Sequence, residues 1–353
     1  MDVEELLKRS VETNASDIFI IPGLPITFKV GGRQIRLEDN GKLMPQQTEE
    51  LIRAIYAHAG RSEKAMEAAD TDDDFSFMLA GIGRFRINVF HQRGSLSAVV
   101  RVIKFDLPTA ESLSLPPEVM KVADFKKGLV LVTGPAGAGK TTTMACILDR
   151  INRSRSGHII TLEDPLEYIH RHDKCIVSQR EIFSDCDSFL SALRSALRES
   201  PDVILLGEMR DCETIEAAMT AAETGQLLFS SIHSTGAANT VDRIVDSFPA
   251  NQQSQVRLQL STVLQAVISQ QLVPGLDGKL HPAFEIMYCN IAIRNLIRES
   301  KTYQMESAIQ AGAAQGMRTM DSSLLEMVKD GIISKDTALT YCINYEAMSR
   351  KLK

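Results

Sequence analysis

The first hundred residues alternate apolar and polar positions with a period of two, which is typical of strands in a half-buried sheet. A helix leads this region, and the apolar positions between Gln47 and Ala69 recur with the spacing of a second helix. The predicted strands cover residues 17–21, 26–30, 75–79, 84–90 and 97–103. This pattern predicts an α+β domain with a largely antiparallel sheet.

Continuous apolar runs replace the alternation after about residue 120, as expected for strands that are buried on both faces. Four runs cover 128–133, 158–162, 203–206 and 226–232, with helical periodicity between several of them. From about residue 250 the pattern turns helical, at 254–272, 291–301, 320–330 with Gly331 as a stop, and 334–345 with Ser334 as N-cap. The alternation predicts an α/β fold, with a parallel sheet covered by helices and a C-terminal helical portion.

Three prolines, Pro108, Pro116 and Pro117, lie between these two regions. Proline suits a linker better than the interior of a helix or strand. We therefore expect a smaller domain over residues 1–106, a linker over 107–120 and a larger domain over 121–353.

Composition and charge narrow the class of protein. The chain has 353 residues, 44% of them hydrophobic, which is enough for two domains. A net charge of −6 argues against a surface built mainly to neutralise nucleic-acid phosphates. Six cysteines without a CxxC pair fit a reducing compartment, and no apolar run approaches the roughly 20 residues that cross a bilayer. We expect a soluble, cytosolic protein.

A glycine-rich segment between the first apolar run and a predicted helix fills the phosphate-loop pattern GxxxxGK[ST]. Its glycines free backbone N–H groups to face phosphate oxygens, and the helix adds the positive end of its dipole. Lys140 would reach the β- and γ-phosphates, and the Thr141 hydroxyl would ligate Mg²⁺. The predicted nucleotide-binding residues are Gly134, Pro135, Ala136, Gly137, Ala138, Gly139, Lys140, Thr141 and Thr142. With this loop on its first strand, the larger domain is predicted to have a RecA-like core that binds ATP and Mg²⁺.

Two candidate acidic residues lie at the C-terminal ends of later predicted strands. Pro165 stops one run and leaves Glu163 at its end, where a carboxylate near a γ-phosphate could deprotonate the attacking water. Glu163 could instead be a solvated turn residue. Asp202 and Glu208 flank the next run about 20 Å apart if it is extended, so they cannot share a metal. Glu208, on the exit side, is the candidate for holding Mg²⁺, although it could also pair with Arg210.

A histidine and two arginines complete the candidate set. His233 ends another buried run and could hydrogen-bond the γ-phosphate and report its loss, although a lone histidine is as often structural. Arg84 and Arg86 share one face of a strand in the first domain. They could supply positive charge to a nucleotide bound by an adjacent subunit, or be solvated strand residues. His170, with His172 and Cys175 nearby, fits a loop rich in solvated charge better than a zinc site, because no second ligand pair follows.

In this order, the segments resemble the type IV pilus retraction ATPases, the PilT family of the secretion ATPase superfamily. Residues 134–142 are similar to its Walker A motif, 161–167 to its Asp box, 203–210 to Walker B and 224–233 to its His box. Residues 83–90 and 292–299 make the resemblance to this family more specific. Residues 292–299 are similar to the AIRNLIRE element of retraction motors. Ala136 and Ala138, where the family commonly has threonine and serine, and Ser234 after the histidine depart from its pattern.

The resemblance implies a PAS-like N-terminal domain, a RecA-like ATPase domain, and a homohexamer with ATP between domains and subunits. It supports Glu163 as general base, Glu208 as the Walker B carboxylate, and Arg84 and Arg86 as arginine contacts. It further implies attachment to the cytoplasmic face of the inner membrane through a pilus platform protein, a second retraction ATPase as a further partner, and no nucleic acid. The function expected is pilus retraction. The alternatives are an accessory retraction, extension or secretion ATPase, a nucleic-acid motor, or a scaffold that binds ATP without turnover.

Overall fold

The computed structural model describes residues 2–38, 41–62, 72–103 and 107–353, which fall into two compact units. The first unit consists mainly of residues before Leu107, and the second of the residues that follow. Among the described residues, no helix has both the length and the apolar character that a bilayer span requires.

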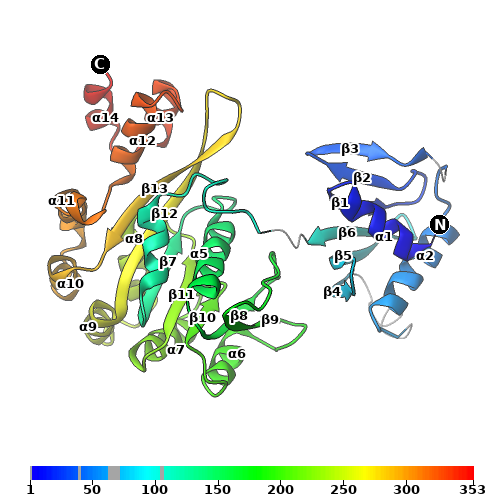
Figure 1. The fold of residues 1–353 in the computed structure, drawn as a ribbon, viewed down its shortest axis with the longest axis horizontal. Coiled ribbons are helices and arrows are strands. Elements are labelled where there is room, and N and C mark those ends of the chain that lie inside the picture. Colours follow the sequence, from blue (N-terminus) through cyan, green and yellow to red (C-terminus); the bar gives the residue numbers. More distant parts are fainter. Residues whose placement is uncertain (1, 39–40, 63–71, 104–106) are drawn as a thin grey trace. The chain divides into compact units, whose positions relative to one another are not determined.

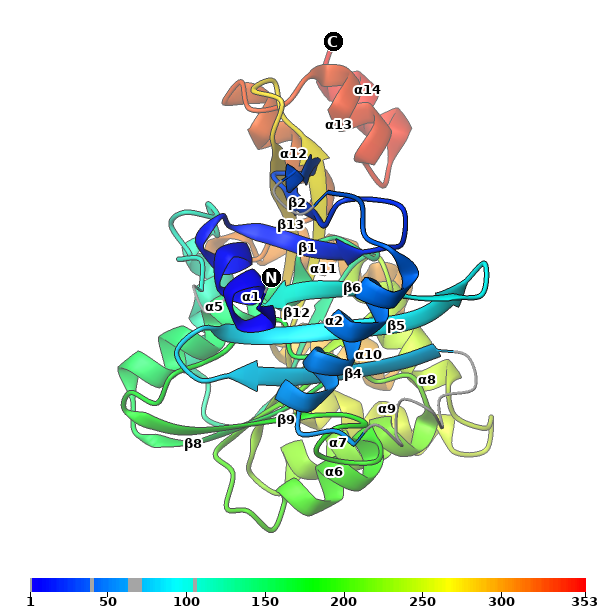
Figure 2. The same cartoon turned by 90° about the vertical axis from the view of Figure 1, so that its right-hand side faces the viewer.

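The N-terminal unit is a six-stranded antiparallel sheet with two helices. The helices are α1 (Val3–Glu12) and α2 (Pro45–His58), and both lie on one face of the sheet (Figure 2). The strands are β1 (Ala15–Ile20), β2 (Thr27–Val30), β3 (Arg33–Arg36), β4 (Asp72–Leu79), β5 (Gly83–Gln92) and β6 (Ser95–Ile103), in the order β3-β2-β1-β6-β5-β4. The predicted antiparallel α+β unit is confirmed. Residues 63–69 of the predicted second helix lie outside the described residues.

The C-terminal unit is built on a seven-stranded sheet in the order β13-β12-β7-β11-β10-β8-β9 (Figure 1). All neighbouring strands are parallel except β12 and β13. The strands are β7 (Gly128–Thr133), β8 (Gly157–Glu163), β9 (Cys175–Glu181), β10 (Val203–Leu206), β11 (Leu227–Ile232), β12 (Leu264–Pro274) and β13 (Leu280–Tyr288). The predicted α/β unit with a mainly parallel sheet is confirmed.

Helices cover both faces of this sheet. On one face, α4 (Pro117–Met120) and α5 (Lys140–Ser154) pack over Val130, Val132 and Phe229. On the other, Leu131, Leu162 and Leu206 lie under α6 (Phe189–Ala196), α7 (Cys212–Glu223), α8 (Ala237–Asp246), α9 (Gln253–Val263), α10 (Ile291–Arg298) and α11 (Met305–Ala311). A separate core of Val273, Ala283 and Leu324 joins the far end of β12 and β13 to α12 (Met320–Lys329), α13 (Lys335–Tyr341) and α14 (Tyr345–Lys351). Consecutive side chains of one strand therefore pack into the cores on opposite faces of the sheet.

The prediction of one helix over residues 254–272 is wrong. Helix α9 ends at Val263, and β12 begins at the next residue and pairs in parallel with β7. Five consecutive residues of β12 from Ala266 are buried, so the strand lacks the two-residue alternation that would have identified it. Ser334 does cap α13, and Gly331 has a left-handed φ of 69° just after α12.

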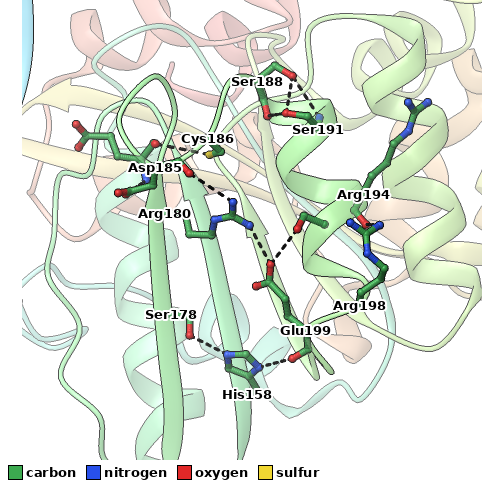
Figure 3. Close-up of polar contacts among 12 residues, drawn as sticks. His158, Ser178, Arg180, Asp185, Cys186, Ser188, Ser191, Arg194, Arg198 and Glu199 are labelled. Carbon is green, nitrogen blue, oxygen red and sulfur yellow. Dashed lines mark hydrogen bonds and ion pairs between the residues drawn. The ribbon is translucent and has the colours of Figure 1, made fainter.

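The edge strand β9 was also absent from the prediction, and polar contacts attach it to the rest of the sheet (Figure 3). Arg180 of β9 donates a hydrogen bond of 2.9 Å to the carboxylate of Glu199, which follows α6. His158 of β8 bridges the Ser178 hydroxyl and the main-chain oxygen of Glu199, at 2.9 Å each. These contacts join β8, β9 and the end of α6.

Candidate active site

The phosphate loop runs from Gly134 to Gly139, between β7 and α5. Gly137 and Gly139 have left-handed φ values of 75° and 84°, which glycine adopts most readily. A Cβ on Gly137 would meet open space, so its role is conformational. Gly139 precedes α5, whose first residue is Lys140, as predicted. The sequence thus produces the strand, turn and helix that a phosphate loop needs.

Lys140 is 8% exposed, and its ammonium donates hydrogen bonds to the main-chain oxygens of Gly134 at 3.1 Å and Pro135 at 2.9 Å. A buried ammonium without partners would be costly, so the loop carbonyls stabilise it here. The charge is held inside the curve of the loop, and the residues present fit a bound polyphosphate.

Glu163, the last residue of β8, is 6% exposed. Side chains alternate along a strand, and Ile159 packs on the core formed with α5 while Leu162 packs on the opposite core. Glu163 therefore faces the side of the sheet that carries α5 and the phosphate loop. Its Oε1 accepts a hydrogen bond of 3.5 Å from Gln179 of β9. Glu163 is not the solvated turn residue that was considered as the alternative.

Glu208 and His233 follow the neighbouring strands β10 and β11, and their side chains approach each other. The Nε2 of His233 lies 3.9 Å from the Oε2 of Glu208, which also forms an ion pair of 2.7 Å with Arg210. The structure thus shows both contacts of Glu208. Asp164 and Glu208 both line a cavity of about 400 Å³ at this edge.

Burial lowers the pKa of His233 below its usual value of 6.5, and the positive charge of Lys140 lowers it further, while Glu208 opposes both. The two lowering effects favour the neutral form of the imidazole. Ile232 of β11 pairs with Thr133 of β7 in parallel, so His233 comes level with Gly134, the first residue of the phosphate loop.

The two candidate arginines, Arg84 and Arg86, lie on β5 of the N-terminal unit. Their side chains share the outer face of the strand, since Phe85 and Ile87 between and beyond them are buried. Arg86 makes a two-pronged ion pair with Asp74 of β4, at 2.9 and 2.8 Å. Arg86 is therefore held within its own sheet. The sequence did not indicate Asp74 as its partner.

His170 departs from the sequence interpretation, because it is 8% exposed, whereas residues 171–174 are exposed as expected for a loop rich in solvated charge. Burial lowers its pKa to about 4. Nearby, the Nδ1 of His172 accepts a hydrogen bond from the main-chain nitrogen of Val177, and the Cys175 thiol donates to the carbonyl of Arg155. Across the described part of the chain, no three His, Cys, Asp or Glu side chains are grouped so that they could hold a metal.

Two residues near the site were missed by the sequence analysis. Arg243 of α8 donates a hydrogen bond of 2.6 Å to the main-chain oxygen of His233. Gln270 of β12 accepts a hydrogen bond of 2.7 Å from the Thr143 hydroxyl, in the first turn of α5. Gln270 was missed because its strand was predicted as a helix, whereas Arg243 carried no motif.

Comparison with known proteins identifies the group to which the chain belongs. Residues 1–340 match the family described as type II/IV secretion system protein. The chain belongs to this family. It is 46% identical over 338 residues to the type IV pilus retraction ATPase PilT of Pseudomonas aeruginosa, covering 96% of this chain and 97% of that protein. It is 39% identical over 342 residues to the type IV pilus ATPase PilU of the same organism, covering 97% of this chain and 88% of that protein.

A solved structure of a family member extends the likeness to the whole fold. The crystal structure of the pilus retraction motor PilT with bound ADP has a TM-score of 0.90 and 44% identity to this chain, and covers 99% of both. The resemblance stated from the sequence motifs is confirmed.

Proposed function

We propose that this protein is an ATP-hydrolysing motor that powers type IV pilus retraction. One observation carries the proposal: the phosphate loop with Lys140, Glu208 and His233 follow the carboxyl ends of three neighbouring parallel strands, in a chain 46% identical to PilT over nearly its full length. On this reading the C-terminal unit is a RecA-like ATPase domain over residues 121–353. The N-terminal unit is PAS-like over residues 1–106, and 107–120 form the connecting segment, the end of which, α4, packs on the C-terminal core.

Each residue has a defined task in hydrolysis. The loop N–H groups from Gly134 to Thr142 hold the phosphates, and Lys140 exchanges its two carbonyl partners for phosphate oxygens. Glu163, on the loop side of the sheet, takes a proton from the attacking water. The neutral ring of His233 donates a hydrogen bond toward the γ-phosphate, and its main chain is tied to α8 through Arg243.

The Thr141 hydroxyl and the Glu208 carboxylate fit a hard cation that prefers oxygen ligands, and would hold Mg²⁺ with the nucleotide. When bound, the cation supplies charge that stabilises the transferring phosphoryl group. Ala136 and Ala138 do not disturb this scheme, because the loop binds phosphate through its backbone.

We further infer a homohexameric ring in which Arg84 and Arg86 reach the nucleotide of an adjacent subunit. The ring would lie in the cytoplasm at the inner membrane, bound to a pilus platform protein, without nucleic acid. A paralogous type IV pilus ATPase is the second candidate, because the chain is also 39% identical to the type IV pilus ATPase PilU.

Two measurements test the function. Steady-state hydrolysis of ATP should be abolished in Lys140→Ala, and should not respond to single-stranded DNA. Strong stimulation by DNA would favour a nucleic-acid motor, and no turnover in the wild type would favour a scaffold. In cells that lack the gene, surface fibres should accumulate and twitching should stop. Loss of fibres would instead indicate an extension motor, and an unchanged number of fibres with normal twitching an accessory one.

A further inference from the structure

Gln270 is a buried amide that lies beside the phosphate loop. It belongs to β12, and it is 3% exposed. Ile268 and Ser269 of β12 pair with Val132 and Thr133 of β7, so Gln270 comes level with the first residue of the loop. Buried amides are costly unless they form hydrogen bonds. A polar side chain at this position therefore requires a reason other than packing.

Gln270 meets the loop and its helix at three points. Its Oε1 accepts a hydrogen bond of 2.7 Å from the Thr143 hydroxyl, which is also buried. Its main-chain oxygen would lie only 2.1 Å from a Cβ on Gly134. Its Nε2 would lie 3.0 Å from a Cβ on Gly139. The first glycine of the loop is thus required by the close approach of β12, in addition to any contact with phosphate.

These three points bracket the loop. Gly134 is its first residue, Gly139 its last, and Thr143 lies in the first turn of α5. A loop fixed at both ends keeps its N–H groups in one arrangement before a ligand arrives, and binding then costs less conformational entropy. The Thr143 contact also holds the first turn of α5, which carries Lys140, against β12.

We propose that Gln270 is a positioning residue for nucleotide binding, which holds the phosphate loop in its binding shape through Thr143 and the two flanking glycines. This inference rests on the proposed ATPase function and adds a residue from β12 to it. Gln270 acts through the loop and makes no contact with the reacting atoms.

The loop contacts phosphates alike in the ground state and in the transition state. Loss of the positioning contact should therefore raise KM and the Kd for nucleotide together, with kcat nearly unchanged. A residue that served packing alone would lower the melting temperature and leave both constants unaltered.

The test uses Gln270→Met, which keeps the length of the side chain but removes its hydrogen bonds, and Thr143→Val, which removes the hydroxyl with little change in volume. Gln271→Met is the matched control, because Gln271 is the next residue on β12, is half-buried and has no hydrogen bond through its side chain among the contacts described. The full-length variants are compared by the Kd of a fluorescent ADP analogue, by KM and kcat for ATP, and by melting temperature.

Gln270→Met and Thr143→Val should each raise KM and the Kd about tenfold, the value of one hydrogen bond. The double variant should be no worse than either single one, because both remove the same contact. A lower melting temperature with unchanged Kd would overturn the proposal, and so would additive effects in the double variant. If Gln270→Met does not fold, Thr143→Val decides by the same criterion. Absence of turnover in both the wild type and Gln271→Met would count against the proposed function instead.

Discussion

Glu285 accepts a hydrogen bond of 2.7 Å from the main-chain nitrogen of Ala237, the first residue of α8. Its second oxygen accepts a bond of 3.4 Å from Met320, the first residue of α12. One buried carboxylate thus satisfies the amino ends of two helices, and it complements their dipoles. Burial raises its pKa, and the two amide contacts oppose that effect. Because α8 follows His233, Glu285 connects the segment after His233 to α12.

Glu285→Gln should destabilise the C-terminal unit by about 1–3 kcal/mol, because the amide NH₂ would face one of the two main-chain donors. Glu299→Gln, at an exposed position after α10, is the matched control. Urea unfolding at pH 7 measures the difference. Equal unfolding midpoints for the two variants would mean that the helix ends do not depend on the carboxylate.

Glu163→Gln should lower kcat for ATP hydrolysis by about 10²–10⁴-fold, the usual contribution of a general base. The amide has the same shape as the carboxylate but accepts no proton, so nucleotide affinity should stay within about threefold of the wild type. Phosphate release and binding of a fluorescent nucleotide measure the two quantities. Glu216→Gln, on the exposed side of α7, should change neither. A Glu163→Gln enzyme with full turnover would remove Glu163 from the mechanism.

The contact between Glu208 and His233 predicts two shifts of opposite sign. Burial and the charge of Lys140 lower the pKa of His233, and the charge of Glu208 raises it. Glu208→Gln should therefore lower the pKa of His233 further, whereas Lys140→Met should raise it toward 6.5. NMR titration of protein with ¹³C-labelled histidine measures both. Shifts in the same direction would mean that these groups do not flank the ring.

The motifs of this site could be predicted from the sequence because each lies where an apolar strand ends. Residues 134–141 and Glu163 needed only the strand boundary and local chemistry. Gln270 could not be found in this way, because α9 passes into β12 without a glycine or proline between Val263 and Leu264. Glu285 could not, because it lies inside β13 and not at a strand end. Their contacts, with Thr143 and Ala237, span 127 and 48 residues along the chain, so only the sheet order brings them together.

The edge strand β9 was missed for a different reason. It begins with the alternation of a half-buried strand, with Cys175 and Val177 buried and Ile176 exposed, but the next three residues are all partly buried and break this alternation. Polar residues continue to its end, where Arg180 pairs with Glu199. Such a strand is held by its hydrogen bonds to β8 and by polar contacts, which hydrophobic patterning does not record.

Mixed rings test whether Arg84 and Arg86 act between subunits. The double variant Arg84→Ala/Arg86→Ala and the variant Lys140→Ala should each be nearly inactive, since an arginine at a γ-phosphate contributes about 10³-fold or more. A 1:1 mixture should regain about a quarter of the wild-type rate, because one site in four then joins an intact loop to intact arginines of its neighbour. Arginines that act within their own subunit would give no recovery.

A control for the mixed rings comes from Asp74, which binds Arg86 through two hydrogen bonds in the N-terminal sheet. Asp74→Asn removes the ion pair and leaves both arginines in place. If the arginines act only through contact with nucleotide, this variant should keep most of its activity. Loss of activity equal to that of Arg84→Ala/Arg86→Ala would assign the arginines a structural role within their sheet.

His170 predicts how stability depends on pH. Burial lowers its pKa from 6.5 to about 4, so the unfolded chain binds its proton more readily than the folded one. The stability that this difference provides is complete above pH 6.5 and is lost as pH falls toward 4. Between pH 7.5 and pH 5 the loss should be about 2 kcal/mol.

His170→Leu cannot take up the proton. Its free energy of unfolding should therefore fall by about 2 kcal/mol less than that of the wild type between pH 7.5 and pH 5. His172→Gln, at an exposed position two residues along, should follow the wild type when urea unfolding is compared at the two pH values. An equal loss in His170→Leu and the wild type would show that His170 is not held neutral by burial.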